Sequence, residues 1–189
     1  MSSAGTVGRD ETVRLFLALR LPDDVLDELD RWGAAHLRDG RRVVREHLHV
    51  TLAFLGRQPE EGVARALEAL RGASARTAPF PLAPVRWRET RSVGMVVLSD
   101  ESGDARRLAA DLHDRLEASG VYRREKRPWL PHVTVLRFRE RPRLAPPLPE
   151  TGTFVPSDAA AYLSHLHPAG ARYEVLESMA LGGSIDEPR

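Results

Sequence analysis

The sequence predicts an α+β fold made as an internal duplication: two lobes, each with an antiparallel sheet and flanking helices, face a central cleft. The main observation is a His-x-Thr-apolar tetrapeptide that occurs twice, at His49 and at His132. Chance predicts about 0.1 copies in a chain of this composition. Each copy follows a strand-like and then a helix-like segment at nearly the same spacing, which indicates duplication.

The composition fits one compact unit. A chain of 189 residues, 42% of them hydrophobic, buries roughly 70% of its unfolded surface. We expect a disordered tail over residues 1–12, one bilobal domain over 13–181 and a C-terminal tail over 182–189. The chain has no cysteine, which excludes thiolate nucleophiles and cysteine-ligated zinc. Without a bilayer-length apolar run or a signal-peptide core, we expect a cytoplasmic monomer with no membrane contact.

The charge balance limits the kind of nucleic acid that the protein can bind. With 28 basic and 27 acidic residues, the net charge of +1 is too small for a protein that coats a nucleic-acid backbone. An RNA partner would be a short piece or an end. Arginine-rich segments at 86–91, 123–127 and 137–143 are either solvated surface or steer RNA towards the cleft. Lys126 is the only lysine, so arginine reflects composition as well as function.

Hydrophobic periodicity gives the elements of the first half in order. The apolar run at residues 13–19 has the length of a strand, and Pro22 with two acidic residues begins a helix that ends near Gly40. The first motif lies in a strand over residues 48–54. The segment 59–71 is an amphipathic helix that Gly72 stops.

The second half repeats this order. Residues 80–87, with two prolines, form at best an edge strand, and residues 92–98 form a strand. A helix over 105–118 carries Leu108, Leu112 and Leu116 on one face. The second motif follows in a strand, and residues 139–152, with four prolines, form a loop. The last strands are expected at 159–167 and 173–181.

Alternation along a strand predicts which residues share a face. His49 and Thr51 share one face with His47 and Ala53, and the apolar face holds Leu48, Val50, Leu52 and Phe54. The same rule places Arg137 on the face opposite His132. Only a bulge or a strand end beyond the second threonine would return Arg137 to the cleft.

Two histidine and threonine pairs suit chemistry at phosphorus. In-line displacement needs a base on one side of the phosphate and an acid on the other. Imidazole serves both roles because its ordinary pKa, about 6.5, keeps both protonation states accessible. Threonine hydroxyls would hydrogen-bond the non-bridging oxygens, where charge grows in the transition state.

The segments E-H-L-H-V-T-L-A-F-L-G and P-H-V-T-V-L-R-F resemble the two motifs of the 2H phosphoesterases. Together with R-L-F-L-A-L-R-L-P near the start and R-Y-E-V-L near the end, they resemble specifically the RNA 2′,3′-cyclic phosphodiesterases, first described as 2′-5′ RNA ligases. The resemblance implies a bilobal fold with no metal or cofactor. It also implies opening of terminal 2′,3′-cyclic phosphates to 2′-phosphomonoesters and reversible 2′-5′ ligation. The implied substrates are RNA ends, including tRNA fragments, or cyclic nucleotides.

By motif position, the resemblance implies that His49, Thr51, His132 and Thr134 are catalytic. We assign His49 as proton donor and His132 as proton acceptor, although the near symmetry of the pair leaves the reverse assignment open. Phe54 and Arg137, each the fifth residue after its histidine, are the implied substrate contacts.

Two other interpretations remain open at this point. The pairs His47 with His49 and His165 with His167 could ligate a metal in a metal-dependent hydrolase. The protein could also be a nucleotide- or RNA-end-binding module without turnover. His47 has no histidine counterpart before His132, where Leu130 stands, so we expect a structural or peripheral role for it. Trp87 and Trp129 are expected in the core or between the lobes rather than stacked on a base.

Overall fold

A computed structural model describes residues 12–165 and 171–183. The expected tails fall mostly outside the described residues, as does His167. In chain order, the elements are β1 (Val13–Arg20), α1 (Asp23–His36), β2 (Arg41–Arg42), the 3-10 helix η1 (Arg45–His47), β3 (Val50–Gln58), α2 (Glu60–Ala75), β4 (Ala83–Glu89), β5 (Val93–Ser99), α3 (Asp104–Ala118), β6 (His132–Arg137), β7 (Asp158–His165) and β8 (Arg172–Met179).

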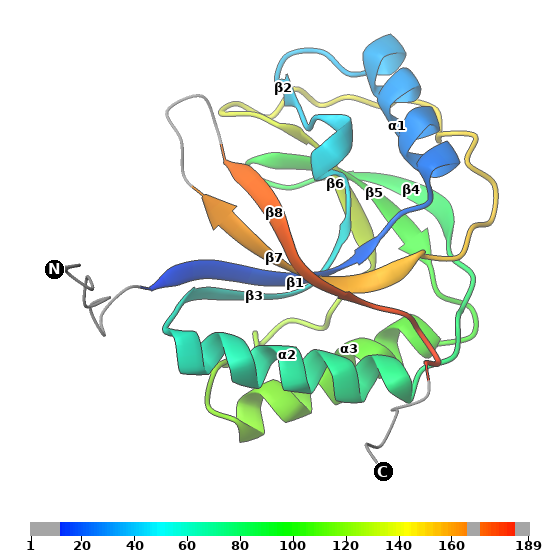
Figure 1. Ribbon diagram of the computed structural model, residues 1–189. Helices are drawn as coiled ribbons and strands as arrows, with labels where there is room; N and C mark the ends of the chain where they lie inside the picture. Colours follow the sequence, from blue (N-terminus) through cyan, green and yellow to red (C-terminus); the bar gives the residue numbers. More distant parts are fainter. Residues whose placement is uncertain (1–11, 166–170, 184–189) are drawn as a thin grey trace, which may run out of the picture.

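The strands confirm the α+β class and form one antiparallel sheet of eight strands (Figure 1). Its order is β4-β5-β6-β3-β1-β7-β8, with the short β2 beside β6. We call β1, β3, β7 and β8 the first lobe, and β2, β4, β5 and β6 the second lobe. We expected two separate sheets, but the pair Val50 and Val133 joins β3 to β6. The lobes are also not halves of the chain, because β7 and β8 complete the first lobe and β2 joins the second.

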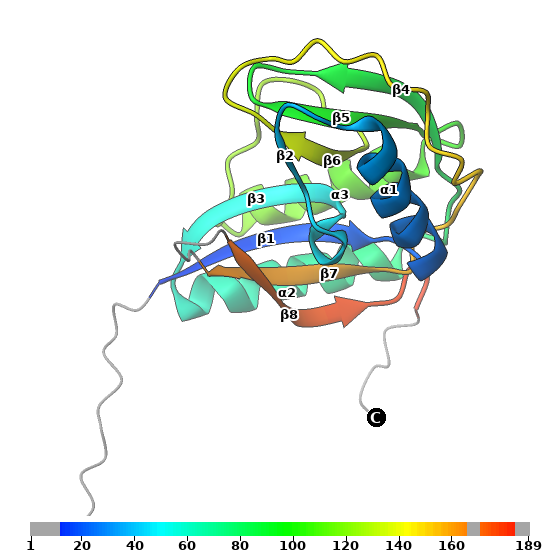
Figure 2. The same cartoon turned by 90° about the horizontal axis from the view of Figure 1, so that it is seen from above.

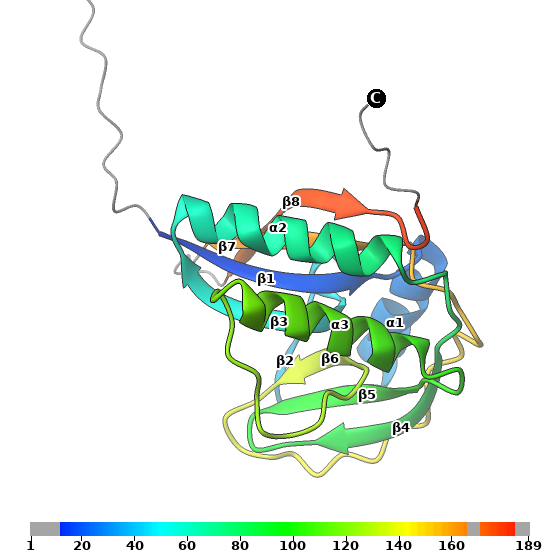
Figure 3. The ribbon, with the colours of Figure 1, turned by 90° about the horizontal axis from the view of Figure 1, so that it is seen from below.

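Helices α1 and α3 each precede one of the motif strands but pack against the other lobe. Helices α2 and α3 lie side by side against the first lobe (Figure 3), and Leu108, Leu112 and Leu116 of α3 are fully buried there. Helix α1 packs towards the second lobe, where the rings of Trp32 and Trp87 lie 6.0 Å apart. Figure 2 shows the segment between α1 and β3 on the side of the sheet away from α2 and α3. The two lobes therefore share one continuous hydrophobic core.

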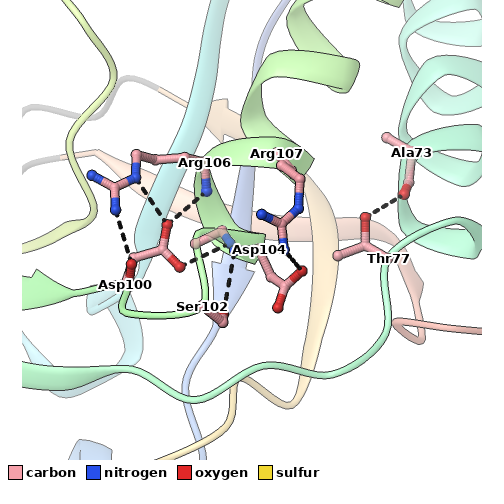
Figure 4. A network of polar contacts seen from close by, with 8 residues as sticks. Ala73, Thr77, Asp100, Ser102, Asp104, Arg106 and Arg107 are labelled. Carbon is pink, nitrogen blue, oxygen red and sulfur yellow. Dashed lines mark hydrogen bonds and ion pairs between the residues drawn. The ribbon is translucent and has the colours of Figure 1, made fainter.

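The helix starts follow the sequence signals. Pro22 and Pro59 directly precede α1 and α2, and acidic residues occupy both first turns, where they complement the helix dipole. Helix α3 depends on a more distant group, the buried carboxylate of Asp100 (Figure 4). It accepts hydrogen bonds from the backbone N–H groups of Ala105 at 3.2 Å and Arg106 at 3.0 Å. These bonds satisfy two donors that every helix N-terminus leaves free. None of the helices within the described residues has the length and apolar character needed to span a bilayer.

The expectation of strict alternation after each motif is wrong, because both motif strands carry a bulge at the same place. The pairing of β3 with β1 skips Leu52, and the pairing of β6 with β5 skips Val135. Each is the third residue after its histidine. A bulge inserts one extra residue and reverses the alternation beyond it. Ala53 therefore enters the core, whereas Phe54 and Arg137 return to the face that holds the histidines.

Pairings beyond the bulges agree with this placement. Phe54 pairs with Phe16, and their ring centroids lie 5.8 Å apart. Arg137 pairs with Val93, and its charge helps to lower the pKa of His49. The strand expected from residue 48 begins instead at Val50, since residues 45–47 form η1. Arg45 ties η1 to α1 through ion pairs with Asp23 and Asp27.

Candidate active site

The four predicted catalytic residues surround the pair that joins the lobes. His49 immediately precedes β3 and Thr51 lies in it, whereas His132 and Thr134 lie in β6. Antiparallel pairing of Val50 with Val133 directs His49 towards Thr134, and Thr51 towards His132. The two motifs are thus related by a pseudo-twofold axis through this pair. All four side chains extend from the same side of the sheet.

The two imidazoles are held in the same way. Nδ1 of His49 donates to the carbonyl oxygen of His47, and Nδ1 of His132 donates to that of Leu130, both at 2.7 Å. Because a carbonyl only accepts, these bonds assign the proton to Nδ1 and leave Nε2 as the reactive nitrogen. His47 and Leu130 occupy corresponding positions in the two motifs, and each contributes only its backbone carbonyl to these bonds. The side chain at this position can therefore be either a histidine or a leucine. In His49, Nε2 also accepts a hydrogen bond from the Thr51 hydroxyl at 3.0 Å.

The imidazoles of His49 and His132 both favour the neutral form at pH 7. Burial, opposed by the hydrogen bond to the His47 carbonyl and assisted by the charge of Arg137, lowers the pKa of His49 to about 4. Burial also lowers the pKa of His132, and the charges of Arg127 and Arg88 add to this effect. Each imidazole is therefore able to accept a proton at Nε2, and a nearby negative charge would raise its pKa.

Aromatic side chains form the wall of the site on the first lobe. The rings of Phe16 and Tyr162 are stacked with centroids 4.8 Å apart, and the His49 ring lies 5.0 Å from Phe16. Tyr173 of β8 packs edge-on against Phe16 and contacts the His47 ring at 4.3 Å. Phe54 extends this cluster outwards and is 61% exposed, a high value for a phenylalanine side chain.

The second lobe contributes arginines instead of aromatic rings. Arg137 lies close enough to lower the pKa values of His47 and His49, and Arg88 and Arg127 act on His132. The site is consequently polarised, with an aromatic wall on one lobe and positive charge on the other. This pair of surfaces suits a nucleobase and a phosphate, respectively.

Two side chains from the second half of the chain hold the bulge of the first motif. The indole Nε1 of Trp129 donates to the Thr51 carbonyl at 2.9 Å, and Nε2 of the buried His113 donates to the Leu52 carbonyl at 2.8 Å. A bulge removes carbonyl groups from the regular ladder, so these bonds replace what the strand pairing lacks. Trp129 also packs against the core, and Trp87 does too, in agreement with the prediction for both residues.

The His-x-His pairs are engaged in other contacts. The His47 ring packs at a tilt against Tyr173, and Nδ1 of His49 donates to a carbonyl. His165 contacts Glu174 at 3.2 Å on the surface, and its partner His167 lies outside the described residues. Within residues 12–165 and 171–183, no group of three or more His, Cys, Asp or Glu side chains is placed to hold a metal ion.

Sequence reasoning missed the aromatic wall and the groups that support the bulge. Phe16 and Tyr173 lie within R-L-F-L-A-L and R-Y-E-V-L, so the two segments that resemble the family also marked the wall. His113 and Trp129 gave no such signal, because their partners are carbonyl groups of another strand.

Comparisons with known proteins agree with this geometry. The family model described as the 2′-5′ RNA ligase superfamily matches residues 21–174. The RNA 2′,3′-cyclic phosphodiesterase of Escherichia coli strain K12 is 31% identical over 176 residues, which cover 90% of this chain and 98% of the relative. The crystal structure of E. coli LigT complexed with 3′-AMP superposes with a TM-score of 0.79 at 27% identity, covering 92% of this chain and all of that one. A protein from Thermus thermophilus matches with a TM-score of 0.74 at 30% identity, covering 90% of this chain and 98% of that one.

Proposed function

The chain belongs to the 2′-5′ RNA ligase superfamily, and we propose that it hydrolyses terminal 2′,3′-cyclic phosphates of RNA or nucleotides to 2′-phosphomonoesters without a metal. The observation that carries the proposal is the pseudo-twofold arrangement of two histidine and threonine pairs about Val50 and Val133. Such an arrangement offers one imidazole to each side of a phosphate. The name of the E. coli relative and the 3′-AMP bound to LigT support a nucleotide substrate.

In the proposed reaction, water attacks phosphorus as the bond from phosphorus to the 3′ oxygen breaks. Nε2 of His132 takes a proton from the water, and protonated His49 gives its Nε2 proton to the departing 3′ oxygen. The hydroxyls of Thr51 and Thr134 donate to the non-bridging oxygens. Once His49 is protonated, its Nε2 no longer accepts a hydrogen bond, so the Thr51 hydroxyl is free to turn to the phosphate.

The surroundings of the two histidines support this assignment of roles. Arginine charges disfavour a cation at both histidines, through Arg88 and Arg127 at His132 and through Arg137 at His49. The two differ in that His49 also lies beside the rings of Phe16 and Tyr162, with centroids 5.0 and 6.0 Å away. Aromatic faces stabilise a cation, so an imidazolium at His49 gains from this wall once an anion supplies the opposite charge.

Phe54 and Arg137 complete the proposed substrate contacts. Phe54 projects from the aromatic wall and is free to stack on the base of the terminal nucleotide. Arg137 is placed to hydrogen-bond the cyclic phosphate through its planar guanidinium. The bulges carry both residues to the histidine side, so the proposal depends on them.

The same site would also support reversible 2′-5′ ligation. If the 5′ hydroxyl of a second RNA replaces water, His132 removes its proton, a bond forms from that oxygen to phosphorus, and His49 again protonates the 3′ oxygen. The product is a 2′-5′ phosphodiester, and the reverse reaction regenerates the cyclic phosphate.

The decisive experiment is incubation of the protein with a 2′,3′-cyclic nucleotide in excess chelator, followed by identification of the phosphomonoester. We expect full activity and only the 2′ isomer. Loss of activity in chelator, restored by added metal, would indicate the metal-dependent alternative. Binding without turnover would indicate a non-catalytic module, and formation of the 3′ isomer would overturn the choice of leaving oxygen.

A further inference from the structure

A concave surface lies at the edge of the second lobe, near the candidate active site. It is an open cavity of about 920 Å³ between β4 and the proline-rich loop after β6. Four arginines line it together with Glu89, namely Arg86, Arg88, Arg141 and Arg143. We call these four residues the arginine rim. The positive charge of the rim suits an anion, and the cavity has a larger volume than one phosphate fills.

Strand register connects two residues of the arginine rim, Arg86 and Arg88, to the catalytic residues. Arg86 pairs with Val97, which pairs with His132, and Arg88 pairs with Met95, which pairs with Thr134. Residues paired across neighbouring strands point to the same side of a sheet. Two strand spacings amount to about 10 Å. Arg86 and Arg88 therefore lie on the histidine side, one side-chain length from the catalytic pair, and the charge of Arg88 contributes to lowering the pKa of His132.

Glu89 holds the loop that forms the side of the cavity opposite β4. Its side chain is only 2% exposed and accepts hydrogen bonds from Arg141 Nε at 3.0 Å and from the backbone N–H groups of Arg143 at 3.0 Å and Leu144 at 2.7 Å. Burial alone would raise the pKa of Glu89, but these donors hold it below its usual value. Arg143 has a φ of 56°, a left-handed conformation that a residue with a side chain seldom adopts without support.

Glu89 therefore fixes the loop and neutralises one arginine. Within residues 12–165 and 171–183, Arg141 pairs with Glu89, but Arg86, Arg88 and Arg143 have no carboxylate within ion-pair distance. Unpaired, exposed guanidinium groups on a preorganised surface bind phosphate through two parallel hydrogen bonds, at little cost in ordering.

We propose that the arginine rim binds the internal phosphates of a single-stranded RNA whose 3′ end carries the cyclic phosphate. The proposal rests on the proposed function and specifies its substrate as an oligonucleotide rather than a free cyclic nucleotide. The base of the terminal nucleotide faces the aromatic wall of the first lobe, and the strand upstream of it crosses β5 and β4. A cyclic mononucleotide has no phosphate that reaches the rim.

The test compares kcat/KM for a 2′,3′-cyclic mononucleotide and for a tetranucleotide that ends in the same group, at several salt concentrations. The wild-type protein should prefer the tetranucleotide, and salt should reduce that preference. Arg86→Gln with Arg143→Gln should lower the tetranucleotide-to-mononucleotide ratio on the order of tenfold. Each lost phosphate contact should also reduce the slope of log(kcat/KM) against log salt by about 0.7.

Arg65→Gln with Arg76→Gln is the matched control, since it also removes two positive charges, from exposed sites on α2 and at its C-terminus, against the other face of the sheet. It should leave the ratio and the salt slope unchanged. An unchanged ratio in the rim variant, or an equal fall in the control, would overturn the proposal. Mononucleotide turnover by the wild-type protein reports separately on the proposed function, so failure of one is distinguishable from failure of the other.

Discussion

The proposed acid role of His49 requires its pKa to rise when an anion binds. In the protein without ligand, burial lowers this pKa to about 4. Only roughly one molecule in 10³ then carries the proton at pH 7. The negative charge of a bound phosphate must therefore raise the pKa of His49, and we expect His49 in the anion complex to titrate near pH 7.

The required energy agrees with the geometry. A rise of about three pKa units corresponds to about 4 kcal/mol. One negative charge about 4 Å from the imidazolium supplies about 4 kcal/mol at the effective dielectric constant typical of such sites. By linkage, an anion binds roughly 10³-fold more tightly to the protein with protonated His49 than to the protein with neutral His49.

The measurement is an NMR titration of the His49 ring, assigned by comparison with His49→Ala, with and without saturating sulfate. Sulfate is a suitable probe because its charge does not change in this pH range. We expect a pKa near 4 without sulfate and near 7 or above with it, because sulfate carries two negative charges and one already supplies about 4 kcal/mol. A His49 pKa that stays below 5 in the complex while that of His132 rises would refute the reasoning and reverse the roles.

Stability gives a second readout of the same shift. The folded-state pKa of His49 lies below its unfolded value of about 6.5, so the unfolded chain binds more protons between these values. The contribution of neutral His49 is present above pH 6.5 and is lost as the pH falls towards 4, by about 3 kcal/mol in total. Denaturant titrations of the wild-type protein and His49→Ala should therefore diverge in their pH dependence across this interval.

Two further predictions concern the catalytic pair and the bulge. His132→Ala should lower kcat by about 10²- to 10⁴-fold with an unchanged circular dichroism spectrum, and a variant that retains full activity would contradict paired acid and base catalysis. His113→Leu should cost about 1–3 kcal/mol in unfolding free energy, because the Leu52 carbonyl loses its donor, and should lower kcat more than it raises KM. His113→Gln places an amide donor near the same point and should recover part of both losses; equal effects of the two substitutions would mean that the hydrogen bond does not position the bulge.

Much of the fold followed from local patterns. The order of strands and helices, the helix starts at Pro22 and Pro59, and the loop at 139–152 agree with expectation, because hydrophobic period and proline act within a few residues. The two-residue strand β2 and the exchange of strands between the lobes were missed. Both depend on pairing with distant segments, which no local pattern reports.

The candidate site also has features that local sequence predicts and features that depend on the pairing of distant segments. The sequence alone determined its chemistry, because the repeated histidine and threonine at equal spacing are visible without a fold. The tertiary structure decided how the pairs meet, through the register of Val50 with Val133, and which way Phe54 and Arg137 point, through the bulges at Leu52 and Val135. Side-chain identity is a local property of the chain, but register and bulges are set by which strands pair, and donors from distant segments hold them in place.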